Sequence, residues 1–209
     1  MAFIMAAIFA GSGTALASEV YIEQAGDSST FNITQSSGSS RVGSVNTPSV
    51  FSGNNIQVDI VQTGTLNEAD LSVLTATDTV IDYTATGGSN ILLVDIANSG
   101  NSLTVLKEGD GNRLTMCGTN SGAGSPAGAS ATCSTAVGVV DTVNTVNIKG
   151  DSNSVNLALA SANAVNTINI GQTTISDNNV VNITQSGAGL HTTAVTVDGN
   201  SNLVNITQQ

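Results

Sequence analysis

Apolar and polar residues alternate strictly along the stretch Val20–Gln35, and this stretch sets the pattern for much of the chain. Between its two halves, residues 26–29 read Gly-Asp-Ser-Ser, a composition typical of a turn. Each half places two apolar residues and one glutamine at every second position, which puts them on one face of a β-strand. These residues are Val20, Ile22 and Gln24, followed by Phe31, Ile33 and Gln35. The stretch predicts two strands joined by a turn.

The same arrangement of two apolar residues and a glutamine returns three times. It supplies Val58, Ile60 and Gln62, then Val181, Ile183 and Gln185, and finally Val204, Ile206 and Gln208. Predicted strands that start at residues 146, 155, 168, 181, 195 and 204 are 9 to 14 residues apart, so two strands take about 22 to 27 residues. Glycines mark the predicted turns, often with Asn or Ser three residues on: Gly26, Gly64, Gly150, Gly187 and Gly199. This regularity indicates a repeat architecture.

One such unit buries too little to fold alone, because each strand offers only two apolar side chains. Stacking units at the strand spacing of about 4.8 Å lays each Val or Ile over its counterpart and pairs the backbone in both directions. A lone buried glutamine would cost about 1–3 kcal/mol, whereas stacked amides bond one another in a ladder. We therefore predict an all-β fold: a β-solenoid of stacked strand–turn–strand repeats with cross-β assembly, whose stacking core is made of the residues named above. An ordinary β-sandwich would also alternate, but it does not predict glutamines in a fixed register.

The N-terminal residues predict export from the cell. An apolar run, Phe3–Ala10, is followed by an Ala-x-Ala site at residues 15–17. This order is typical of a secretory signal peptide over residues 1–17, and the alternative is a buried N-terminal segment. The remaining residues, 18–209, show no sharp change in composition and are predicted to form one domain. Loop insertions rich in Ser, Gly and Asn are predicted at about 36–55 and 117–133.

The two cysteines flank the second of these loops. In an exported chain, Cys117 and Cys133 are expected to form a disulfide. Closing a loop of about 15 residues stabilises the fold by roughly 3 kcal/mol. A metal site is the alternative, but two cysteines and the distant His191 supply too few ligands.

Charge and composition narrow the function. The chain has a net charge of −11 and only 4 Lys and Arg residues, so it cannot build the basic stripe that nucleic acid requires. His191 has no nucleophile or acid at a supporting spacing, and we predict neither enzymatic activity nor a cofactor. Aspartates at predicted turns suit either calcium or ordinary turn chemistry: Asp27, Asp110, Asp151, Asp177 and Asp198.

The order V-x-I-x-Q-x-G-x-x-S-x-F-x-I-x-Q in Val20–Gln35 resembles the curlin repeat of curli-type functional amyloids. Val195–Gln208 is similar, with Asp198-Gly199 in place of the first glutamine, and Val58–Val73 follows the repeat through its Gln, Gly and Asn. Two features depart from that family: no glycine-rich segment precedes Val20, and the middle repeats lose the glutamine, for example to Lys107.

The resemblance implies a secreted structural subunit that self-assembles into extracellular amyloid fibres at the cell surface, for biofilm matrix and surface adhesion. Its implied partners are further copies of the same chain, a nucleator subunit and an outer-membrane secretion pore. The alternative function is a monomeric β-solenoid that acts as an adhesin or as a ligand- or calcium-binding module.

Overall fold

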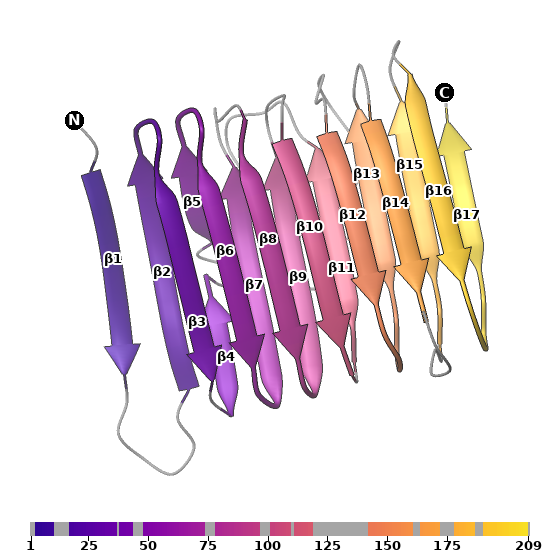
Figure 1. The fold of residues 1–209 in the computed structure, drawn as a ribbon, viewed down its shortest axis with the longest axis horizontal. Helices are drawn as coiled ribbons and strands as arrows, with labels where there is room; N and C mark the ends of the chain where they lie inside the picture. Colours follow the sequence, from indigo (N-terminus) through magenta and orange to yellow (C-terminus); the bar gives the residue numbers. More distant parts are fainter. Residues whose placement is uncertain are drawn as a thin grey trace.

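The computed structural model describes residues 3–10, 17–36, 38–43, 48–73, 78–96, 101–109, 111–118, 142–160, 164–171, 178–186 and 190–208. These residues form strands and turns, without a helix, and so without a helix that could cross a membrane. The strands stack into a β-solenoid, as the sequence predicted, with the N- and C-terminal strands at opposite ends of the stack (Figure 1).

Two sheets face each other in the described part of the chain. The seven-stranded sheet contains, in spatial order, β16 (His191–Val197), β14 (Ala164–Ile170), β12 (Thr142–Ile148), β10 (Asn101–Glu108), β8 (Val80–Thr86), β6 (Gln57–Thr63) and β3 (Thr30–Ser36). The ten-stranded sheet contains β1 (Phe3–Ala10), β2 (Ala17–Ala25), β4 (Ser39–Val42), β7 (Leu66–Val73), β9 (Ser89–Ile96), β11 (Arg113–Gly118), β13 (Val155–Ala160), β15 (Val181–Ser186) and β17 (Val204–Gln208), together with β5 (Ser49–Ser52), which pairs with β2 and β7.

From β2 onward the chain alternates between the sheets, with β4 and β5 together taking one place in the ten-stranded sheet. We call each such place in the ten-stranded sheet, with the strand that follows it in the other sheet, a rung. Successive rungs pair in parallel and in register, so side chains line up in columns. In the ten-stranded sheet one column is apolar throughout: Val20, Val42, Ala69, Leu92, Leu114, Val155, Val181 and Val204. The facing column in the other sheet is Ile33, Ile60, Tyr83, Val105, Val146, Ile168 and Val195. These columns form the core, because alternation turns every second residue inward.

The predicted loop at about 36–55 is wrong, because this segment contains the strands β4 and β5. They lie end to end between β2 and β7, with Val20 paired to Val42 and Gln24 to Phe51. The pairing offset therefore grows from 22 to 27 residues across the break between β4 and β5. Ser40, Val42, Ser49 and Phe51 are buried, so the period-two alternation persists beneath a Ser- and Gly-rich composition.

The second predicted loop leaves the stack undisturbed. Residues 119–133 lie outside the described residues, and β11 pairs in register with β13, with Leu114 beside Val155. At the other end of the stack, β1 pairs with β2 in antiparallel orientation. It lies within the segment predicted to be a signal peptide, and its removal stays a prediction.

Glycine is required where turns of neighbouring rungs touch. Gly87 has a φ of +119°, and a Cβ built on it would lie 1.9 Å from the carbonyl oxygen of Gly64 on the preceding rung. Neither the backbone angle nor the space accommodates a side chain.

We therefore expect Gly87→Ala to lower the free energy of unfolding by about 1–3 kcal/mol, measured by urea denaturation of the soluble chain. Gly38→Ala is the matched control, because a Cβ there would meet only Thr65 Oγ1 at 4.0 Å. Equal stability of the two variants would contradict this account of the turn contact.

Candidate functional site

Stacked asparagines line the turns that lead into the ten-stranded sheet. Asn67 Nδ2 donates to Asn90 Oδ1 at 2.9 Å, and Asn153 Nδ2 donates to Asn112 Oδ1 at 2.9 Å. The column continues as Asn179 bonds to Asn153 at 2.6 Å and Asn202 bonds to Asn179 at 2.5 Å. We call this column the asparagine ladder; its members are Asn67, Asn90, Asn112, Asn153, Asn179 and Asn202.

Several ladder asparagines also bond to the turn that precedes them. Asn90 Nδ2 donates to the carbonyl oxygen of Gly87 at 2.9 Å, and Asn153 Nδ2 donates to that of Gly150 at 2.8 Å. The recurring Gly-x-x-Asn spacing was the signal of this arrangement. It was interpreted as turn chemistry alone, so the sequence analysis missed the buried amide column.

Two pairs of the predicted glutamines bond in register, one pair in each sheet. Gln62 Nε2 donates to Gln35 Oε1 at 2.8 Å in the seven-stranded sheet, and Gln208 Nε2 donates to Gln185 Oε1 at 2.9 Å in the other sheet. Gln24 lies beside Phe51 and donates to Ser29 Oγ at 3.0 Å instead. All five occupy inward positions, but consecutive strands belong to opposite sheets. After Gln62 the column continues with Ala85, Lys107 and Ile148, so no further glutamine extends the pair.

The apolar members of the predicted stacking core occupy inward positions along the whole stack. Val20 and Phe31 are half-buried at the N-terminal rung, where the Phe31 and Phe51 rings meet edge to face at 5.4 Å. Val204 and Ile206 on β17 are 41% and 44% exposed, at positions that are buried in the preceding rung. The buried members are Ile22, Ile33, Val58, Ile60, Val181 and Ile183.

Lys107 occupies the column of Gln35 and Gln62 and is completely buried. Its Nζ donates to the backbone carbonyls of Asn90, at 3.3 Å, and Arg113, and lies 5.7 Å from the centre of the Tyr83 ring. The Tyr83 hydroxyl in turn donates to Gln62 Oε1 at 2.9 Å. Burial, and then the charge of Arg113, lowers the pKa of Lys107 well below its usual range.

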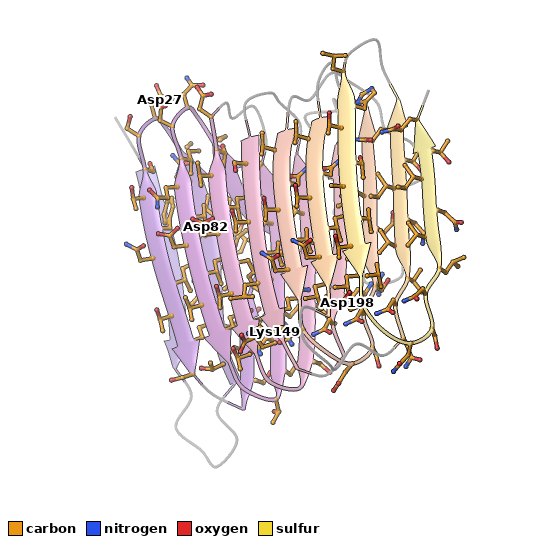
Figure 2. The ribbon with its side chains drawn as sticks, turned by 45° about the vertical axis from the view of Figure 1, so that its right-hand side comes forward. Asp27, Asp82, Lys149 and Asp198 are labelled. Carbon is orange, nitrogen blue, oxygen red and sulfur yellow. The ribbon has the colours of Figure 1, made fainter. Side chains whose placement is uncertain are left out.

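Charged groups in the described residues are dispersed rather than gathered into a site. Among those residues, no three His, Cys, Asp or Glu side chains lie close enough together to hold a metal ion. Figure 2 shows Asp27, Asp82, Lys149 and Asp198 spread along the stack. Asp27 Oδ1 accepts a hydrogen bond from the backbone N–H of Asn54 at 2.7 Å and so joins the turns of two neighbouring rungs.

Several predicted residues lie beyond what the structure describes. Asp110, Asp177 and Cys133 fall outside the described residues, and Cys117 is described only as part of the β11 backbone. The disulfide stays a prediction. His191 begins β16 and is half-buried.

The two ends of the stack differ from its interior. β3 ends the seven-stranded sheet and β17 ends the ten-stranded sheet among the described strands. Each therefore presents a backbone edge that the stack itself does not pair.

Comparison of the chain with known protein families, with curated proteins and with solved structures found no match.

We expect Asn90→Ala to lower the free energy of unfolding by about 1–3 kcal/mol, because it removes both the bond that Asn90 accepts from Asn67 and the bond that it donates to the carbonyl oxygen of Gly87. Asn32→Ala, on the exposed face of β3, is the control and should change stability by less than about 0.5 kcal/mol. Urea denaturation of both variants checks this. A similar small effect for both would show that the ladder contributes little.

The buried lysine predicts a pH dependence. The pKa of Lys107 is 10.5 in the unfolded chain and well below that value in the folded chain. At a pH between these two pKa values, the unfolded chain holds a proton that the folded chain has released. The free energy of unfolding therefore rises with pH in that window, by at most about 1.4 kcal/mol per pH unit. Lys107→Met abolishes this rise.

The test is the urea midpoint of both chains between about pH 7 and 9, at least about one unit below the pKa of tyrosine in the unfolded chain. As pH rises, the urea midpoint of the original chain should increase relative to the midpoint of the Lys107→Met chain. Lys149→Met, which removes an exposed lysine, is the control. Parallel curves for the original chain and Lys107→Met would contradict a lowered pKa for the buried amine.

Proposed function

We propose that this chain is a structural subunit that self-assembles by stacking into extracellular fibres. The observation that carries the proposal is the open last rung. Val204 and Ile206 on β17 continue columns in which Val181 and Ile183 are 0% and 1% exposed. A strand of another copy placed on β17 would bury these side chains and pair the open backbone edge.

The composition of the end strands supports the same proposal. β17 reads Val-Asn-Ile-Thr-Gln and β3 reads Thr-Phe-Asn-Ile-Thr-Gln-Ser, both without charge. Proteins that protect their sheet edges usually place Lys, Pro or an inward charge there. The chain has a net charge of −11, but none of its charged residues lies on β3 or β17. Two copies that meet through these strands therefore place no like charges opposite each other.

The curlin-like repeat supports the biological setting of the proposal. In that setting the chain is exported with a signal peptide, passes an outer-membrane pore, is started by a nucleator subunit, and serves biofilm matrix and surface adhesion. The competing function is a monomeric β-solenoid that binds a surface or ligand, and assembly state separates the two.

Ile206→Asp should block fibre elongation and leave secretion intact, because it places a charge in the column that the next copy covers. Seeded growth followed by dye fluorescence and electron microscopy measures elongation. Val143→Asp is the matched control, since Val143 is 52% exposed on β12 in the middle of the stack. Normal growth of the Ile206→Asp chain would rule out the end-strand mechanism, as would equal inhibition in both variants.

A further inference from the structure

The strands at the two ends of the stack share a tetrapeptide. Asn-Ile-Thr-Gln occupies residues 32–35 in β3, 182–185 in β15 and 205–208 in β17. β15 and β17 are neighbours in the ten-stranded sheet, whereas β3 ends the opposite sheet at the far end of the stack (Figure 1). The same inward and outward side chains therefore appear on both sheets.

The winding of the chain decides which strand of a second copy continues the stack. β16 lies in the seven-stranded sheet and β17 in the ten-stranded sheet, so the next place in the alternation lies over β16. A copy that starts there sets its β2 on β16 and its β3 on β17. If β2 were set on β17 instead, β3 would lie about 9.6 Å from β16, two strand spacings away, and the seven-stranded sheet would be interrupted.

We propose that β17 of one copy pairs in parallel with β3 of the next, so that the two sheets exchange at every subunit junction. The ten-stranded sheet of one copy then continues as the seven-stranded sheet of its neighbour, and successive copies differ by about a half turn around the stack axis. This inference rests on the proposed self-assembly and specifies its geometry.

Register at the β17–β3 contact extends a ladder that already exists within the chain. Between β15 and β17, Asn205 bonds to Asn182 at 3.2 Å and Gln208 bonds to Gln185 at 2.9 Å. On the β3 side, Gln62 bonds to Gln35 at 2.8 Å. The junction lays identical residues over one another at all four positions of the tetrapeptide, which is the arrangement that stabilises amide ladders.

The alternative junction, β2 on β17, keeps this match only at the two inward positions, Ile22 over Ile206 and Gln24 over Gln208. It would lay Tyr21 over Asn205 and Glu23 over Thr207 and so end the outward asparagine column. In the proposed junction, β2 meets β16 instead, with Val20 over Thr193 and Ile22 over Val195. The outer edge of β2 carries β1, which lies within the predicted signal peptide, so this half of the junction requires β1 to be removed or displaced.

Cross-linking between two singly substituted chains tests the register. A Thr207→Cys chain is co-assembled with a Thr34→Cys chain, or with a Glu23→Cys chain as the matched alternative; all three side chains are exposed. Residues directly opposite on adjacent strands are about 4.8 Å apart at Cα, within disulfide range. After oxidation, proteolysis and mass spectrometry identify the linked peptides separately from those of the native cysteines.

The expected result is a 207–34 link in fibres, with the 207–23 link at background. Fibres that contain the 207–23 link, or neither link, would overturn sheet exchange and leave self-assembly standing. Helical reconstruction of unsubstituted fibres gives an independent reading: about a half turn between copies supports the proposal, and an untwisted repeat overturns it. A parent chain that forms no fibres would instead refute the proposed function itself, and this inference with it.

Discussion

Stacking in register is the constraint on which the rest of the structure depends. A rung has two apolar side chains on each strand and polar amides on the same inward faces. The amide of Asn90 is buried, and it is satisfied because Asn67 lies directly beside it on the neighbouring rung. A slip of one residue would turn the apolar columns outward and separate these partners. Each rung is therefore stable only as part of the stack.

The same constraint explains where the chain tolerates irregularity. The offset in residue number between paired residues is 22 for β8 and β10, 27 for β3 and β6, and 41 for β10 and β12. Extra residues are accommodated between strands, where the loop-closure entropy grows only slowly with length. The strands themselves keep their register on both sides of each insertion. Lys107 shows that one column can even hold a buried amine, provided that backbone carbonyls accept its hydrogen bonds.

Much of this fold could be predicted because alternation with period two is a local property. Val20–Gln35 alone indicates two strands and a turn, and the repeats indicate stacking. The strands β4 and β5 were missed because serines replace the residues that mark the other strands: Ser40 pairs with the ladder residue Asn67, and Ser49 pairs with Leu71. The division of the glutamines between the two sheets was not predicted, because alternation reports which face a residue takes and not which of the two sheets its strand joins. That assignment depends on how the whole chain winds.

The candidate site was predicted in outline but not in its amides. Asn67 and Asn90 come three residues after turn glycines, where asparagine is common for local reasons, so their burial and their bond to each other are visible only once the rungs are stacked. The open last rung follows from the columns: Ile206 belongs to a set whose preceding member is buried. The proposed self-assembly would close such a column with the same interaction that builds it.

The most direct test of this account is fibre diffraction from the purified chain, incubated without ligand and seeded with its own aggregates. The account predicts fibres with a reflection near 4.7 Å along the axis and one near 10 Å across it, the spacings of stacked strands and facing sheets. A chain that remains a folded monomer in the presence of seeds would contradict it.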